Sequence, residues 1–179
     1  MMRAEHFEAL AAVLDYPRDG YLGEVGEAVQ QLTALCPEAG EALKSFVKRV
    51  HDLDIEQLRE LFTRTFDLDP DCCLDVGWHL FGDHYDRGDF LVRMRGHLRR
   101  LGVEESTELP DHLTHVLRAL ARMDADEAAE FISTYGLPAL DKMRARLVDK
   151  DNPYEQVLHA VREALAASQS VRKQGAHHA

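Results

Sequence analysis

The feature that most constrains the fold is the helical spacing of apolar residues along nearly the whole chain. The clearest apolar stripes run over residues 55–66, 90–101 and 113–123, where side chains recur three or four positions apart. We find no convincing run of alternating apolar and polar residues with β-branched enrichment, which a half-buried strand would need. Because each apolar stripe must be buried against another element, the pattern predicts an all-α fold.

Proline and glycine separate these stripes from further amphipathic runs. Such breaks occur at Tyr16-Pro17, Cys36-Pro37, Gly136 to Pro138 and Asn152-Pro153. The intervals predict a bundle of about nine or ten helices with short connections. With 179 residues in total, we expect one helical domain over residues 1–165 and a disordered tail over residues 166–179, where the apolar periodicity is lost.

Charge and composition exclude several classes of protein. The net charge of −11 and the absence of a segregated basic patch argue against a nucleic-acid partner. No stretch approaches the roughly 20 apolar residues that cross a bilayer, so membrane insertion is not expected. Charged residues interrupt the first apolar run, and three cysteines form no regular disulfide framework. We therefore expect a cytoplasmic protein.

The acidic residues are concentrated in two segments. Residues 67–75 contain four Asp, and residues 104–111 contain three Glu and one Asp, with no Lys or Arg in either segment. Solvated loops and helix N-termini explain such runs, because the helix dipole favours carboxylates there. The alternative is an electrostatic landing site for a basic peptide.

A small metal site is the first catalytic alternative. His112 and His115 are three residues apart, with Glu108 one turn earlier, so three ligands could share one face of a helix. The spacing matches neither a zincin nor a di-iron motif. The structural alternative is that Asp111 caps a helix that begins after Pro110, while both histidines face solvent.

The adjacent pair Cys72-Cys73, with His79 or His84, is a second candidate. Adjacent cysteines lack the Cys-x-x-Cys geometry, and nearby Asp residues disfavour a thiolate. We expect these thiols to be structural. Phosphate-binding loops and serine nucleophile elbows have no local support.

An aromatic segment lies between the two acidic segments. Trp78 and Phe81 fall near one face of a helix predicted to start near Cys72. Such residues commonly belong to a core. They could also line an apolar groove with an acidic rim, which would hold an amphipathic basic helix.

These residues belong to a pattern that resembles a known family. The matching fragments are Leu14-Asp15-Tyr16-Pro17, Thr65-Phe66-Asp67, Cys73-Leu74, Leu80-Phe81-Gly82-Asp83, Arg87-Gly88, Glu108-Leu109-Pro110-Asp111-His112-Leu113, Pro153-Tyr154 and Val157-Leu158. They are similar in type and spacing to the NarJ-type nitrate reductase assembly chaperones, within the wider TorD/DmsD family of redox-enzyme maturation proteins.

The resemblance implies a chaperone that catalyses no reaction and holds no stably bound cofactor. Its client would be a molybdoenzyme catalytic subunit, such as the nitrate reductase alpha subunit or a related reductase or dehydrogenase. The client carries a molybdopterin cofactor and an iron-sulfur cluster, and molybdenum cofactor biosynthesis proteins are further possible partners. The family's mode of action implies that the chaperone binds the client's basic N-terminal peptide during cofactor insertion.

The same resemblance implies a location for the peptide. It places Pro110, Asp111 and His112 at or beside the binding groove, with Glu108 next to them. We add Trp78 and Phe81 as apolar contacts and Asp67 as an acidic contact. A charge reversal at Asp111 is expected to weaken peptide binding without unfolding the protein.

Overall fold

The computed structural model describes the backbone of residues 2–175 and the side chains of residues 2–169. Within this part of the chain there are ten α-helices and no strand beyond one isolated bridge, which confirms the all-α prediction. The helices are α1 (Ala4–Ala12), α2 (Tyr21–Leu35), α3 (Pro37–Val50), α4 (Ile55–Phe62), α5 (Val76–Phe81), α6 (Tyr85–Leu101), α7 (Leu113–Leu120), α8 (Ala125–Phe131), α9 (Leu137–Leu147) and α10 (Tyr154–Gly175). Two π-helical turns, η1 (Thr63–Asp67) and η3 (Ile132–Gly136), and two short 3-10 helices, η2 (Pro70–Cys72) and η4 (Val148–Lys150), complete them.

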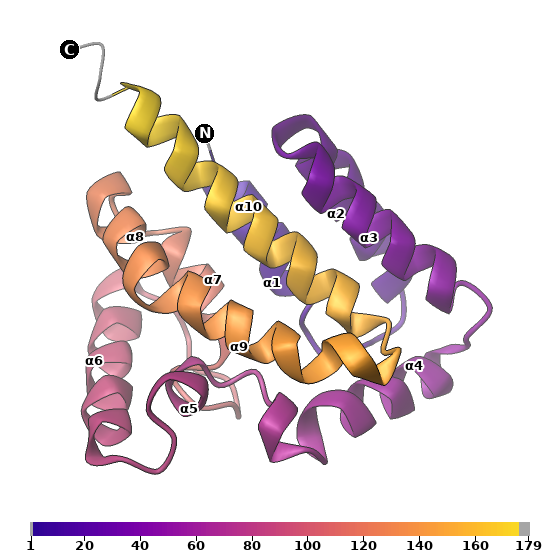
Figure 1. The fold of residues 1–179 in the computed structure, drawn as a ribbon, viewed down its shortest axis with the longest axis horizontal. Helices are drawn as coiled ribbons and strands as arrows, with labels where there is room; N and C mark the ends of the chain where they lie inside the picture. Colours follow the sequence, from indigo (N-terminus) through magenta and orange to yellow (C-terminus); the bar gives the residue numbers. More distant parts are fainter. Residues whose placement is uncertain (1, 176–179) are drawn as a thin grey trace.

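The long helix α10 organises the bundle. It packs against α3 on one side and α9 on the other, and α2 covers α3. Figure 1 shows α1 behind α10, where it contacts α2 and α7. The helices α5 and α6 lie beside α9 and α7, at the opposite end of the molecule from α2 and α3. This arrangement surrounds the first turn of α5 with later elements of the chain.

An aromatic cluster fills the core where α3, α4 and α10 meet. Tyr154, at the start of α10, lies 5.0 Å from both Phe46 and Phe66, measured between ring centroids, and 5.6 Å from Phe62. Edge and tilted contacts of this kind are the favourable geometry for aromatic pairs. The Asn152 side chain caps α10 by accepting a hydrogen bond from the Tyr154 amide at 2.9 Å. The cap at Asn152 therefore fixes the start of α10 so that the Tyr154 side chain points into the core.

Helices α8 and α9 are joined through η3 without a loop. The sequence predicts a boundary at Gly136 to Pro138, yet the backbone stays helical across it. Proline lacks an amide hydrogen and clashes with the preceding turn of an α-helix. Here the turn widens, and the Leu137 amide donates to the carbonyl of Ile132, five residues earlier. The π-helical turn accommodates the proline, so the backbone remains helical where the sequence predicts a break.

The last helix extends beyond its predicted end at Leu165. It continues to Gly175, Ala167 packs against the core, and the Ser168 hydroxyl donates to the carbonyl of Leu165 at 2.6 Å. Residues 166–175 of the predicted tail are thus helical, and the small residue Ala167 still packs against the core after the large apolar residues stop. Residues 176–179 lie outside the described residues.

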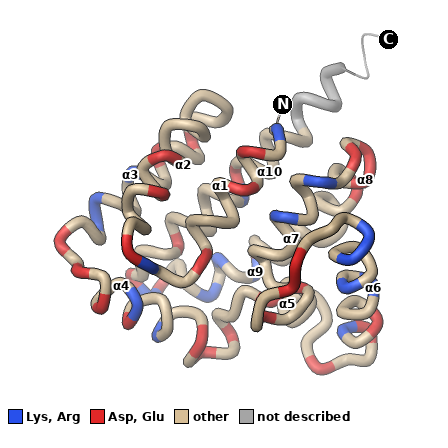
Figure 2. Tube along the Cα trace, turned by 180° about the vertical axis from the view of Figure 1, so that it is seen from behind, with Lys and Arg blue, Asp and Glu red and all other residues tan. Residues whose placement is uncertain are grey.

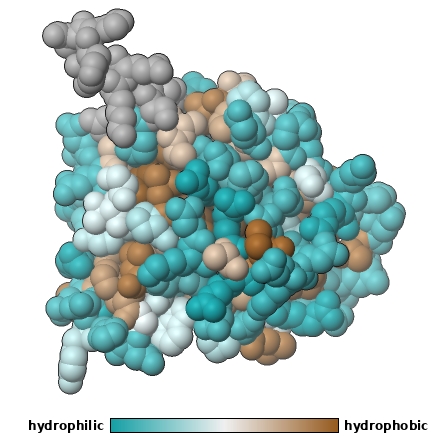
Figure 3. Space-filling model, in the orientation of Figure 1, coloured by the Kyte–Doolittle hydropathy of each residue, from teal (hydrophilic) through white to brown (hydrophobic). Residues whose placement is uncertain are grey.

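Apolar surface is sparse on the visible face. Figure 3 shows a largely hydrophilic surface with apolar residues in small separate groups. Across residues 2–175, no helix is both long enough and apolar enough to cross a membrane.

Candidate functional site

The segment between α6 and α7 is anchored to the start of α5. The Val76 amide donates to the carbonyl of Asp111 at 3.0 Å, and the Leu113 amide donates to the carbonyl of Leu74 at 2.8 Å. These two bonds form the isolated antiparallel bridge between Asp75 and His112. The bridge fixes the Pro-Asp-His segment against a part of the chain more than thirty residues away in sequence.

Asp111 lies wholly inside the protein. Its Oδ2 accepts a hydrogen bond from the buried amide of Gly77 at 2.8 Å, and its Oδ1 has no partner in the described part of the chain. Gly77 permits this approach, since a Cβ there would lie 2.7 Å from Oδ2. The prediction that Asp111 caps the following helix is wrong, because its carboxylate instead binds the first turn of α5.

Burial also changes the expected effect of Asp111 substitutions. Burial raises the pKa of Asp111, while the Gly77 amide and the Arg87 guanidinium oppose this rise. A lysine at this position would place a second cation near Arg87 in the interior. The substitution Asp111→Lys is therefore expected to destabilise the fold, contrary to the expectation from sequence.

Arg87 connects the buried carboxylates to the aromatic helix. Its Nη2 lies 3.3 Å from Oδ2 of Asp75, and its guanidinium lies 5.2 Å from the centre of the Trp78 ring. Burial, with a contribution from Asp111, raises the pKa of Asp75 to about 6 despite the opposing effect of Arg87. Asp75, Arg87 and Asp111 thus form a largely buried polar cluster that stabilises the bridge between Asp75 and His112.

His112 is the residue that caps α7. Its Nδ1 accepts a hydrogen bond from the Thr114 amide at 3.4 Å and lies 2.8 Å from the Thr114 hydroxyl. Burial, with smaller contributions from the neighbouring His115 and Arg118, lowers the pKa of His112 to about 3. The imidazole is half-buried and neutral, which differs from the expected exposed first turn.

His115 holds in place the loop of residues 104–111, called the acidic loop from here on. Its Nδ1 lies 2.8 Å from the carbonyl of Leu109, to which it donates, and its Nε2 accepts from the Ser106 amide at 3.0 Å. The side chain is 1% exposed, so the prediction that it faces solvent is wrong. With both nitrogens engaged, His115 has no free electron pair for a metal ion.

The proposed metal ligands do not form a cluster. Glu108 is exposed, His112 caps a helix, and His115 is buried. Within the described residues, no group of three or more His, Cys, Asp or Glu side chains could hold a metal ion.

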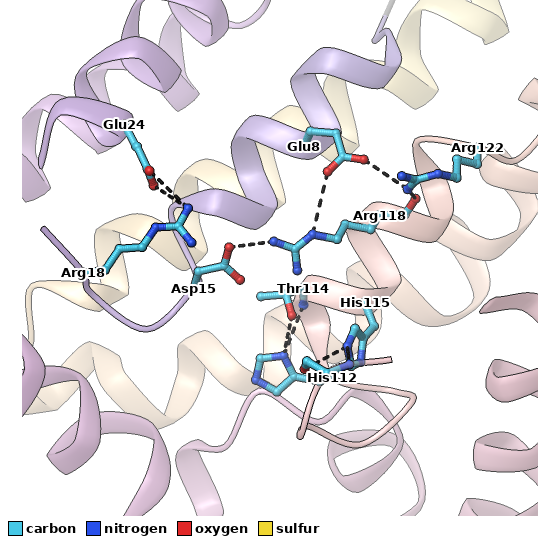
Figure 4. Close-up of polar contacts among 10 residues, drawn as sticks. Glu8, Asp15, Arg18, Glu24, His112, Thr114, His115, Arg118 and Arg122 are labelled. Atoms are coloured by element: carbon cyan, nitrogen blue, oxygen red, sulfur yellow. Dashed lines mark hydrogen bonds and ion pairs between the residues drawn. The ribbon is translucent and has the colours of Figure 1, made fainter. Parts of the chain in front are cut away.

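A set of ion pairs beside His112 joins α7 and the residues just after it to α1 and the residues just after it (Figure 4). Arg118 Nη2 lies 2.6 Å from Oδ2 of Asp15, and Arg122 Nη1 lies 3.1 Å from Oε1 of Glu8. Sequence reasoning missed this contact, since 103 residues separate Arg118 from Asp15. The only available signal was the occurrence of Asp15 in the Leu14-Asp15-Tyr16-Pro17 fragment.

The outer face of the acidic loop is open. Glu104 and Glu108 are exposed without an ion-pair partner among the described residues, whereas Glu105 pairs with Arg95 at 3.0 Å. Leu109 lies between them and the cap, with 43% of its surface exposed. Figure 2 shows the loop as an acidic segment beside the basic residues of α6. Free carboxylates beside an exposed leucine suit a basic, partly apolar segment.

The other predicted contacts lie in different places. Trp78 is half-buried and lines a cavity between α5 and α9, whereas Phe81 packs on Phe90 with ring centroids 5.4 Å apart. Asp67 is exposed at the end of η1, and no described hydrogen bond or ion pair connects it to the Pro-Asp-His segment. The structure therefore does not gather all predicted contacts around Asp111 and His112.

The cysteines are free thiols in protected positions. Burial raises the pKa of Cys73 to about 11 and also raises the pKa of Cys72. The His79 Nε2 donates to the carbonyl of Cys73 at 2.7 Å and does not activate a thiol. A raised thiol pKa opposes thiolate chemistry. This agrees with the structural role expected from sequence.

Comparison with known proteins identifies the family. The family model described as nitrate reductase delta subunit matches residues 26–160, which is more than half of the chain. Two curated relatives, from Escherichia coli K12 and Escherichia coli O157:H7, are named nitrate reductase molybdenum cofactor assembly chaperone NarJ. Each is 28% identical over 149 residues, a match covering 81% of this chain and 63% of the relative. This chain belongs to the nitrate reductase delta subunit family.

Proposed function

We propose that this protein is a cytoplasmic assembly chaperone for a molybdoenzyme of the nitrate reductase type. It binds the N-terminal peptide of the catalytic subunit and assists insertion of the molybdenum cofactor, without catalysing a reaction. The observation that carries this proposal is the family match over residues 26–160, together with the relatives named as assembly chaperones. The client carries the molybdopterin cofactor and the iron-sulfur cluster, and molybdenum cofactor biosynthesis proteins are proposed as further partners.

The proposed peptide contact is the outer face of the acidic loop and the start of α7. Glu104 and Glu108 supply negative charge, Leu109 supplies apolar surface, and the half-buried imidazole of His112 borders them. A basic amphipathic peptide gains association rate and specificity from such complementary charge. Asp111 acts through its neighbours, since it is buried and can only position the segment.

The alternative of a small metal-dependent enzyme has little geometric support. Of its proposed ligands, Glu108 is exposed and His112 caps α7. His115 uses both ring nitrogens in hydrogen bonds to the backbone of the acidic loop. A nucleic-acid partner is disfavoured by the net charge of −11.

Isothermal titration with N-terminal peptides of molybdoenzyme catalytic subunits tests the proposal. We expect saturable binding of one peptide, weakened about tenfold or more at low salt by Glu104→Lys combined with Glu108→Lys. High salt should reduce this difference because both carboxylates are exposed. A Leu109→Ser variant separates the apolar contribution, since it leaves the charge unchanged.

A matched control lies on the other side of the bundle. Glu27 on α2 is exposed and has no ion pair among the described residues, so Glu27→Lys makes elsewhere the same charge change as either single loop variant, Glu104→Lys or Glu108→Lys, with which it is compared. Binding should stay within about twofold of the original. Equal weakening by the control and the loop variant would contradict the placement of the peptide, and no peptide binding at all would contradict the proposed mode of recognition.

A further inference from the structure

The cavity between α5 and α9 has a composition unlike the rest of this acidic chain. It measures about 540 Å³, which is within the usual range for small-molecule sites. Trp78 and His79 line it from α5, and Lys142 and Arg146 line it from α9. Asp71 is its only acidic lining residue. An otherwise acidic protein thus presents two cations around one cavity.

The two cations are available to a ligand. Lys142 and Arg146 are four residues apart, so they share one face of α9. The Lys142 Nζ donates to the carbonyl of His79 at 2.8 Å, which leaves its charge without a described counterion. Arg146 Nη1 lies 3.7 Å from Oδ2 of Asp71, and both side chains are more than half exposed. Such a long, solvated ion pair is weak, so an incoming anion can replace it.

The helix α5 adds a flat aromatic surface. Trp78 is the only tryptophan of the chain, and contact with the Arg87 guanidinium holds its ring. His79 is fixed by its hydrogen bond to the carbonyl of Cys73, and burial together with Arg146 and Lys142 lowers its pKa. A neutral imidazole presents no further charge, and Nδ1 remains as a hydrogen-bond acceptor for a ring N–H.

We propose that this cavity binds a small organic phosphate with a planar ring, whose phosphate contacts Lys142 and Arg146 and whose ring packs against Trp78. Arginine and lysine are the usual partners of phosphate oxygens, and aromatic side chains stack on planar rings. The volume and the single indole favour a compact ligand over an extended acidic peptide. The site lies on α5 and α9 and is independent of the proposed peptide contact on the acidic loop.

Fluorescence of Trp78 gives a direct test on the full chain without any client. The probes are AMP, GMP, adenosine, ribose 5-phosphate and inorganic phosphate, each titrated at low salt and checked by calorimetry. We expect AMP or GMP to change the fluorescence saturably, with Kd below about 1 mM, and the other three to bind at least about tenfold more weakly. Comparing AMP with GMP distinguishes the base.

Opposite shifts are expected from two kinds of variant. Lys142→Gln combined with Arg146→Gln should weaken nucleotide binding about tenfold or more, because charge-assisted contacts are lost. Asp71→Asn should strengthen it, because the competing carboxylate is removed. Arg99→Gln is the control matched to each single substitution, Lys142→Gln or Arg146→Gln, since Arg99 is an exposed cation on α6 with no ion pair in the described part of the chain.

Several results would overturn the proposal. Equal binding of ribose 5-phosphate and AMP would remove the role of the ring, and equal weakening by Arg99→Gln would indicate a general charge effect. Binding of a short poly-glutamate peptide, with no response to either nucleotide, would assign the cavity to an acidic protein segment. An unchanged response in Asp71→Asn with normal circular dichroism would contradict the geometry.

Discussion

The substitution Asp111→Ala tests whether the buried carboxylate supports the Pro-Asp-His segment. It leaves the buried Gly77 amide without its acceptor at 2.8 Å and removes negative charge near Arg87. An unsatisfied buried donor costs about 1–3 kcal/mol, and more when the lost partner is charged. Relief of the carboxylate's own desolvation offsets part of this loss. We therefore expect the free energy of unfolding to fall by about 2–3 kcal/mol.

Urea denaturation at pH 7, followed by far-ultraviolet circular dichroism and by Trp78 fluorescence, measures this loss. Asp111→Asn keeps a carbonyl oxygen for the Gly77 amide and should cost only about 1 kcal/mol. Glu104→Ala is the control, because its exposed side chain has no described ion pair, and it should stay within about 0.5 kcal/mol of the original protein. The reasoning is refuted if Asp111→Ala matches the control, or if Asn is as damaging as Ala.

Two further substitutions probe the same region. Gly77→Ala would place Cβ 2.7 Å from Oδ2 of Asp111 and 2.9 Å from Cδ1 of Phe90. It should lower the free energy of unfolding by about 1–3 kcal/mol in the same assay, and an unchanged midpoint would show that the close approach is tolerated. The pKa of His112 is lowered to about 3 in the folded protein. As the pH falls below the ordinary histidine pKa of about 6.5, this side chain is therefore protonated in the unfolded state before it is protonated in the folded state. The contribution of His112 to the free energy of unfolding is full above about pH 6.5 and decreases on acidification, by about 1–2 kcal/mol at pH 5. His112→Asn retains a capping acceptor and should lack this loss, whereas an equal stability difference from the original protein at pH 7 and pH 5 would contradict the assignment.

The helices could be predicted because their signal is local. Apolar spacing located them, and Asn152-Pro153 marked the start of α10 correctly. Gly136 to Pro138 misled the prediction, because a proline's effect depends on whether the surrounding turn can widen. The helical extension past Leu165 depends on packing of small side chains against the core, which periodicity alone does not reveal.

The site was harder to predict because its contacts are long-range. The motif around Pro110 was recognised, but Asp111 was expected to act locally as a cap. Its actual partner, Gly77, is 34 residues away, and no local pattern distinguishes a buried acceptor from an exposed cap. His115 was likewise expected at the surface, although it bonds the loop backbone from inside. Family resemblance located the segment, and only the three-dimensional packing shows which side chains it leaves accessible.

The measurement that tests the central claim most directly is the molybdenum content of the client enzyme. The nitrate-reductase-type catalytic subunit would be purified from cells with and without this protein, and its molybdenum would be determined by elemental analysis. We expect the subunit from cells lacking the protein to be deficient in molybdenum, with restoration by the original chain and reduced restoration by Glu104→Lys combined with Glu108→Lys. A full molybdenum complement in the absence of the protein would contradict the proposed role in cofactor insertion.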